Sequence, residues 1–297
     1  IYALFHHVAI WDDSKYWPKA YGVNGFVTIE GEKMAKSKGN IIPLKDLMSE
    51  HGADLVRLNI ATANENIDDA DWREDSLKAF NSKLAFLEQL VEDWGKASRK
   101  SAAKIDKYMV SVLQNCVKGA TDNYEVMRFR SGIQYAIFQL LNELQHYIQR
   151  CGGIKNCNKL VLKESVVTVV KLIAPFTPHL SEELWEELGG KGFVSVADWP
   201  TFDQSKIDKA TMDMENILKK VQEDLVQVIK LAGNKKTAYL YFLTDKEFDY
   251  FKDVGNYLKD IFSFDKVVIY KASDKNKHDP ENRASRAKFG KPAIYLE

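Results

Sequence analysis

The amino-acid sequence predicts an α+β protein built from several domains. Strand-like apolar runs punctuated by Gly and Asn occupy residues 1–75, and apolar residues at helical spacing dominate residues 76–203. Strand-like runs return within residues 204–297. A chain of 297 residues is long enough for two or three such domains. We therefore expect domain boundaries near residues 75 and 203.

The first segment should be mixed α/β. Phe5–Ile10 and Gly25–Ile29 have the apolar, β-branched composition of strands. Residues 52–60 read as the opening of an amphipathic helix.

The middle segment should be an antiparallel helical bundle. Apolar residues three and four apart mark helical stripes, and Pro175 and Gly189-Gly190 are stop signals. Short connections between amphipathic helices favour antiparallel neighbours. The predicted helices cover residues 77–94, 105–120, 133–148, 164–173 and 178–188.

The last segment should be a small α/β domain. Residues 192–202 read as a crossing segment, and a helix is predicted over residues 208–231. Strand-like runs follow at residues 237–243, 266–270 and 292–296, with an amphipathic stretch at 246–260.

The composition indicates the cellular compartment of the protein but does not decide its function. The 42 Lys and Arg residues balance 42 Asp and Glu residues, so a nucleic-acid partner is neither required nor excluded. No apolar run is long enough to cross a membrane. The odd set Cys116, Cys151 and Cys157 contains no Cys-x-x-Cys pair, which argues against a disulfide framework or a structural zinc site. We expect a cytoplasmic protein with free thiols, no metal site and no membrane partner.

One segment has a composition suited to chemistry. Residues 31–40 read Gly-Glu-Lys-Met-Ala-Lys-Ser-Lys-Gly-Asn and follow a predicted strand. Clustered ammonium groups and backbone N–H donors in a loop suit a polyphosphate. By composition alone, however, this signal is weak, and a solvated basic loop is the better explanation of the segment.

Lys33–Asn40 resembles the Lys-Met-Ser-Lys-Ser motif of class I aminoacyl-tRNA synthetases, in the extended Lys-Gly-Asn form of the enzymes for leucine, isoleucine, valine and methionine. Ala35 replaces a Ser at the most tolerant position of the motif. The resemblance covers the whole chain, and it is also carried by Tyr21–Phe26, Gly52–Leu58, Asp71–Arg73 and Ala174–Trp185.

The resemblance implies a fold and a chemistry. Residues 1–75 would be the C-terminal part of a Rossmann-type catalytic domain with the motif loop, residues 76–203 an anticodon-binding bundle, and residues 204–297 a small tRNA-binding domain. ATP with Mg²⁺ would be the substrate that the loop binds. Lys36 would be the catalytic residue that contacts the phosphates in the transition state, and Lys33, Met34 and Ser37 would help to bind ATP.

The histidines are expected to have supporting roles. His6-His7 should pack near the back of the nucleotide pocket, and His179 should pack against or cap a helix start. Neither is expected to act directly in catalysis.

Two elements of the family are absent from this sequence. It has no His-x-Gly-His element, the other half of the ATP site, and no editing insertion; both lie upstream of the loop in the family. A start without Met fits a fragment, which we expect to be inactive alone. A natural subunit of a split synthetase and a free-standing tRNA-binding module are alternatives, but the complete Lys-x-x-Lys-Ser pattern argues against a decayed loop.

The lead-in Val23–Phe26, the junction Asp71–Arg73 and the end Lys-Pro-Ala-Ile-Tyr-Leu-Glu resemble leucyl-tRNA synthetases of the archaeal and eukaryotic type. The implied partners are tRNA(Leu), ATP and, through the missing half, leucine, with the protein a monomer. An isoleucyl- or valyl-tRNA synthetase fragment is the alternative.

Two basic clusters are candidates for tRNA contact. Arg128-Phe129-Arg130 interleaves cations with an aromatic ring, although a helix start with one buried Phe explains it equally well. An acid-free run near the end suits backbone phosphates, and in the family this tail contacts the long variable arm of the tRNA. That run contains Arg283, Arg286, Lys288 and Lys291.

Overall fold

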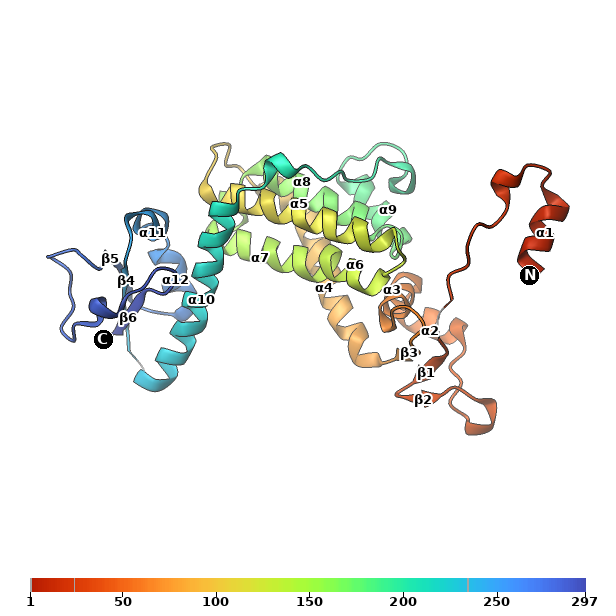
Figure 1. The fold of residues 1–297 in the computed structure, drawn as a ribbon, viewed down its shortest axis with the longest axis horizontal. Coiled ribbons are helices and arrows are strands. Elements are labelled where there is room, and N and C mark those ends of the chain that lie inside the picture. Colours follow the sequence, from red (N-terminus) through yellow and green to blue (C-terminus); the bar gives the residue numbers. More distant parts are fainter. Residues whose placement is uncertain (1, 24, 234) are drawn as a thin grey trace.

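A central bundle of helices joins a small mixed sheet on one side to a second small sheet on the other, which gives the molecule its elongated outline (Figure 1). The computed structural model describes residues 2–23, 25–233 and 235–297. Asn24, part of the predicted lead-in to the basic loop, lies outside these residues. Within the described ranges, no helix is both long and apolar enough to span a membrane.

The first sheet has the strand order β2-β1-β3. β1 (Val27–Ile29) pairs antiparallel with β2 (Glu32–Lys33) and parallel with β3 (Ala70–Trp72). A parallel pair needs a long crossover connection, and here α2 (Leu44–His51) and α3 (Ala53–Ala63) supply it. The strand at 25–29 and the helix at 52–60 are thus where the sequence predicted them.

The strand predicted at Phe5–Ile10 is wrong. Residues Tyr2–Ile10 form helix α1, which stands apart from the rest of the molecule in Figure 1. A strand needs a neighbour to pair its backbone groups, whereas a helix satisfies them internally. No strand in the described ranges pairs with this segment, so the apolar run forms a helix whose Tyr2, Phe5 and Ile10 side chains are exposed.

The bundle contains the main hydrophobic core. Its helices follow the predicted stripes closely, because each stripe packs against its neighbours around Met109, Ile137 and Val169. The helices are α4 (Glu74–Asp93), α5 (Lys104–Tyr124), α6 (Phe129–Ile133), a π-helical turn (Gln134–Gln139), α7 (Leu140–Arg150), α8 (Lys159–Ile173) and α9 (Pro178–Glu187).

The start of α8 differs most from the prediction. α8 begins at Lys159, five residues before the predicted Glu164. The Asn158 carboxamide oxygen accepts hydrogen bonds from the N–H groups of Leu160 and Val161, at 3.0 and 3.3 Å, and so caps the helix at the earlier position.

α10 (Lys209–Ala232) runs from the bundle to the second sheet (Figure 1). Its Met212 packs against the bundle core, while Leu218, Val221 and Leu225 belong to the core of the last segment. That segment contains β4 (Thr237–Phe242), α11 (Asp245–Phe251), α12 (Gly255–Phe262), β5 (Lys266–Lys271) and β6 (Ala293–Leu296).

The second sheet has the order β5-β4-β6, with β4 parallel to β5 and antiparallel to β6. All three strands lie where strand-like runs were predicted. The amphipathic stretch at 246–260 is divided into α11 and α12.

Candidate functional site

The basic loop extends from a tight hairpin. β1 and β2 are joined at Glu30 and Gly31, which have positive φ values of 50° and 82°. Two consecutive left-handed residues are the geometry that a two-residue hairpin requires, and Gly31 adopts it without a steric cost. The hairpin therefore fixes the direction in which residues 33–40 leave the sheet.

Asp71 on β3 anchors this hairpin. Its carboxylate accepts hydrogen bonds from the Gly31 N–H at 2.7 Å and the Thr28 hydroxyl at 2.9 Å, and it pairs with Arg73 at 2.7 Å. The hydrogen bond from Gly31, followed by that from Arg73, lowers the pKa of Asp71. The charged carboxylate is thus the form that holds the turn.

Asn40 closes the loop on itself. Its side-chain oxygen accepts a hydrogen bond from the Ala35 N–H at 2.9 Å, and its side-chain nitrogen donates to the Lys33 carbonyl at 3.1 Å. Between them, Lys36–Lys38 form one 3₁₀ turn that ends at Gly39 with φ of 67°. The backbone is therefore tied at both ends of an otherwise exposed segment.

The loop lysines differ in what they contact. The Lys38 ammonium pairs with Glu32 at 3.2 Å, and the Lys33 ammonium lies 5.3 Å from the centre of the Phe26 ring. Lys36 is exposed, and its ammonium has no hydrogen bond or ion pair within the described ranges. Ser37 is also exposed, and Met34 is half-buried. Lys36 is therefore the cation of this loop best placed to meet an anionic ligand.

α3 fastens the loop-bearing sheet to the bundle. Arg57 donates to the carbonyls of Pro175 and Phe176, at 2.9 and 3.3 Å. Asp54 accepts from the Leu180 N–H at 2.7 Å and contacts His179 at 2.8 Å. Because both residues reach the segment that begins α9, the loop and the bundle form one framework.

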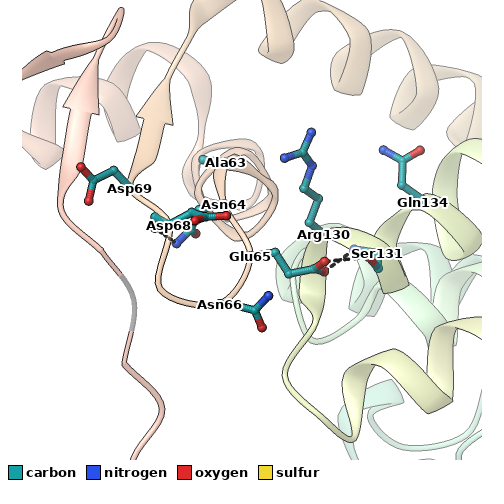
Figure 2. Close-up of a pocket in the computed structure, with 9 residues that line it drawn as sticks. All are labelled: Ala63, Asn64, Glu65, Asn66, Asp68, Asp69, Arg130, Ser131 and Gln134. Atoms are coloured by element: carbon teal, nitrogen blue, oxygen red, sulfur yellow. Dashed lines mark hydrogen bonds between the residues drawn. The ribbon is translucent and has the colours of Figure 1, made fainter.

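A polar cavity of about 370 Å³ lies between the end of α3 and the start of α6 (Figure 2). Glu65 accepts hydrogen bonds from the N–H and hydroxyl of Ser131, both at 2.9 Å, and these are the dashed lines of Figure 2. The Arg130 side chain points away from Glu65. With Asp68 and Asp69 also in the lining, the cavity has a mixed charge that does not favour a phosphate.

Comparison with known families identifies the two parts. The profile of the anticodon-binding domain of tRNA ligases matches residues 106–243, and that of class I (M) tRNA synthetases matches residues 3–93. The second match contains the whole basic loop. The chain belongs to the class I tRNA synthetases.

The relatives of this synthetase chain include leucine–tRNA ligases. It is 38% identical to that of Pyrococcus furiosus over 82% of the chain and 26% of the relative. Identity is 35% to that of Pyrococcus horikoshii, over 94% of the chain and 29% of the relative. Identity to the leucine–tRNA ligase of Methanosarcina mazei is 36%, over 81% of the chain and 25% of the relative. The chain thus spans between a quarter and a third of the length of these curated relatives.

A solved structure shares the fold. The crystal structure of the ternary complex of Agrobacterium radiobacter K84 agnB2 LeuRS with tRNA and LeuAMS has a TM-score of 0.56 with this chain. The two are 24% identical, and the match covers 70% of this chain and 27% of that one.

The predicted RNA-contacting arginines of the synthetase bundle lie at the start of α6. Arg128 precedes the helix, and Phe129 packs against Tyr124 and Phe176 while remaining 38% exposed. Arg128 and Arg130 are both exposed, and neither guanidinium has a partner among the described residues. The unpaired cations and the helix start are therefore present, but Phe129 is exposed and not buried as the alternative required.

The four basic residues predicted near the end of the chain lie in different environments. Arg283 pairs with Glu281 at 2.7 Å, so its charge is neutralised locally. Arg286, Lys288 and Lys291 are exposed, and Phe289 between them is 63% exposed. A backbone bridge between Lys288 and Lys291 forms the turn that presents these side chains.

The predicted packing of His6-His7 is wrong. Both residues lie on α1, where His6 is exposed and His7 Nδ1 lies 2.8 Å from the Ala3 carbonyl of the same helix. His179 does lie at a helix start, where Asp54 caps α9 and contacts the imidazole.

Sequence reasoning missed Asp71 and Asn40 as the residues that hold the loop. Asn40 was quoted only as part of the motif, and Asp71 only as part of a junction. The left-handed turn at Glu30-Gly31 is the signal that could have pointed to a nearby carboxylate.

Proposed function

We propose that this chain supplies the motif-loop half of the ATP site and the tRNA-binding part of a leucine–tRNA ligase, which attaches leucine to tRNA(Leu) at the cost of ATP. The support for leucine is that the relatives at 35–38% identity are leucine–tRNA ligases. One observation carries the proposal. Lys36 matches the second lysine of the motif and is an exposed, unpaired cation on a loop tied at both ends.

The proposed chemistry is mainly electrostatic. Activation of leucine forms a bond between its carboxylate and the α-phosphorus of ATP and releases pyrophosphate. Negative charge develops on the departing phosphates, and the Lys36 ammonium would neutralise it there. Lys33, Met34 and Ser37 would line the nucleotide beside it, with ATP bound as its Mg²⁺ complex.

The loop's construction fits this role. Asn40 and Asp71 hold the two ends of the segment, while the lysine side chains extend freely from it. A catalytic cation gains most when its backbone is positioned in advance, since less order is lost as the ligand binds.

We also propose the domain organisation in which residues 1–75 complete the catalytic domain, 76–203 form the anticodon-binding bundle, and 204–297 form a C-terminal tRNA-binding domain. The protein would act as a cytoplasmic monomer. tRNA contacts are assigned to Arg128 and Arg130 on the bundle and to Arg286, Lys288 and Lys291 on the tail, since these cations are exposed. Arg283 is a weaker candidate because its guanidinium forms an ion pair with Glu281.

Lys36→Ala tests the proposal in the protein that carries this chain together with the first half of the ATP site. We expect leucine-dependent pyrophosphate exchange to fall by roughly 10²-fold or more, the range for loss of one donor to a developing anion. Lys38→Ala is the matched control, because that lysine is paired with Glu32 on the same loop. Exchange within about threefold of wild type for Lys36→Ala would overturn the assignment, since that is below the range expected for such a donor.

A further inference from the structure

The loop between α7 and α8 brings two of the cysteines together. Cys151 directly follows α7, and Cys157 follows a 3₁₀ turn at Ile154–Asn156. Gly152 and Gly153 have positive φ values of 72° and 109°, so the chain reverses between the two cysteines. Both cysteines then lie against Arg99, whose guanidinium is 3.8 Å from the Cys151 sulfur and whose backbone N–H donates to the Cys157 carbonyl at 3.2 Å.

A fixed cation lies beside the first thiol. Arg99 Nη2 is 3.8 Å from the Cys151 sulfur. The same guanidinium forms two hydrogen bonds to Asp106, at 2.6 and 2.7 Å, and one to the Asn156 carbonyl at 2.7 Å. Arg99 is thus held next to the sulfur by contacts that do not depend on Cys151.

The two thiols have different environments. Cys151 is partly exposed, and the neighbouring Cys157 thiol and then the Arg99 guanidinium lower its pKa, although burial and the Asp106 charge oppose this. Cys157 is fully buried and donates to the Gly153 carbonyl at 3.6 Å. Its hydrogen bond with Cys151, together with burial, raises the pKa of Cys157. The pair therefore combines an accessible nucleophile with a protected thiol.

Cys116, unlike Cys151, is an inaccessible thiol. It is fully buried in the core of the bundle, and burial raises the pKa of its thiol to about 12. A thiol in this setting is inert because neither thiolate nor access is available. It provides an internal reference within the same chain.

We propose that Cys151 and Cys157 form a peroxide-sensitive dithiol, in which Cys151 is the attacking and Cys157 the resolving cysteine. The Cys151 thiolate attacks one oxygen of hydrogen peroxide, so an S–O bond forms, the O–O bond breaks, and hydroxide leaves as water after taking a proton. The Cys157 sulfur then attacks the sulfenic sulfur of Cys151. The S–S bond forms, the S–O bond breaks, and the second oxygen leaves as water with the Cys157 proton. Peroxide is reduced to water as the two thiols are oxidised to one disulfide.

The rest of the fold should tolerate this step. Arg99 loses its contact with the Cys151 sulfur but keeps Asp106 and the Asn156 carbonyl. Asp106 also keeps the hydrogen bond from Tyr147, 2.7 Å away. The oxidised and reduced forms should therefore differ in the α7–α8 loop and not in the bundle core.

Peptide mapping of the native full chain tests the proposal. The chain is treated with hydrogen peroxide, blocked with N-ethylmaleimide, unfolded and digested with trypsin. Cleavage after Arg150, Lys155 and Lys159 separates the two cysteines into Cys-Gly-Gly-Ile-Lys and Asn-Cys-Asn-Lys. We expect these peptides to be joined, two hydrogen atoms lighter than their sum and released by a reductant, while Cys116 remains a thiol.

Serine variants separate the roles. Cys157→Ser should leave a sulfenic acid on Cys151 that dimedone captures, at least about tenfold faster than any adduct at Cys116. Cys151→Ser should abolish the disulfide, and Cys116→Ser should form it as the wild type does. Equal labelling of Cys116 and Cys151, a disulfide between two chains, or native thiols that stay free under peroxide would each overturn the proposal. Should Cys157→Ser fail to fold, dimedone competition in the wild-type chain measures the same intermediate.

Discussion

Asp71 and Gly31, forty residues apart, are joined by a 2.7 Å hydrogen bond from a backbone N–H to a carboxylate. This bond lies at the turn from which residues 33–40 extend, so it links β3 to the start of the basic loop. A carboxylate that accepts this bond in its charged form makes the turn sensitive to pH.

Asp71→Asn should loosen the hairpin at neutral pH. The carboxamide can still accept from Gly31, but the ion pair with Arg73 is lost. Because the pKa of Asp71 is lowered in the fold, its contribution is present above the unfolded value of about 3.9 and is lost as pH falls below it. Amide exchange at Gly31 should therefore be faster in the variant at pH 7 and converge with the wild type at low pH. A constant ratio across this range would contradict the role of the charge.

Asn40 variants should separate positioning of the loop from its charge. Asn40→Asp keeps the acceptor for Ala35 but loses the donor to Lys33, whereas Asn40→Ala removes both. In the complete enzyme, we expect pyrophosphate exchange to fall by about fivefold for Asp and about thirtyfold for Ala, since each net hydrogen bond contributes about 1 kcal/mol. Thermal unfolding should barely move, because the loop is exposed. Equal rates for both variants and wild type would show that the loop needs no such closure.

Glu215 is a fully buried carboxylate at the joint between the bundle and the tail. Burial favours its neutral form, but hydrogen bonds from His146 and Arg150, at 2.9 Å each, lower the pKa of Glu215 to about 2. Tyr250 of the tail donates to the same carboxylate at 2.9 Å. The contact between the bundle and the tail therefore includes a buried ion pair, with residues from α7, α10 and α11.

Glu215→Gln should lower the free energy of unfolding by about 3–5 kcal/mol at pH 7, because it leaves the buried Arg150 charge without its partner. The control Glu164→Gln removes an exposed partner of Lys206. It should change the free energy of unfolding by under about 1 kcal/mol. The pKa of Glu215 is depressed, so its stabilisation exists above the unfolded value of about 4.3 and declines as pH falls toward 2. Urea unfolding from pH 7 to pH 2 should show the difference in the free energy of unfolding between wild type and Glu215→Gln becoming smaller. A difference that stays constant over this range would exclude a contribution from the charge of Glu215.

The sequence could predict the elements whose signal is local. Stripes at helical spacing located the bundle helices and α10, since burial of one face forces that spacing. Phe5–Ile10 was wrongly predicted as a strand, because a short apolar run becomes a strand only when a neighbour pairs with it. Contacts between distant residues were equally invisible: Arg57 reaches Pro175 across 118 positions. Cys151 and Cys157 both lie against Arg99 because Gly152 and Gly153 reverse the chain between them.

Charge reversal on the tail should weaken tRNA binding through its dependence on salt. The triple variant Arg286→Glu, Lys288→Glu, Lys291→Glu changes three exposed cations and leaves the backbone bridge of their turn in place. If these cations neutralise phosphates, the slope of log K against log salt should fall by about two, since each contact contributes about 0.7 to 0.9. Arg283→Gln is the control and should leave the slope unchanged, because Glu281 already neutralises Arg283. Filter binding of tRNA(Leu) between low and physiological salt measures both, and a triple variant with the wild-type slope would place the tRNA on another surface.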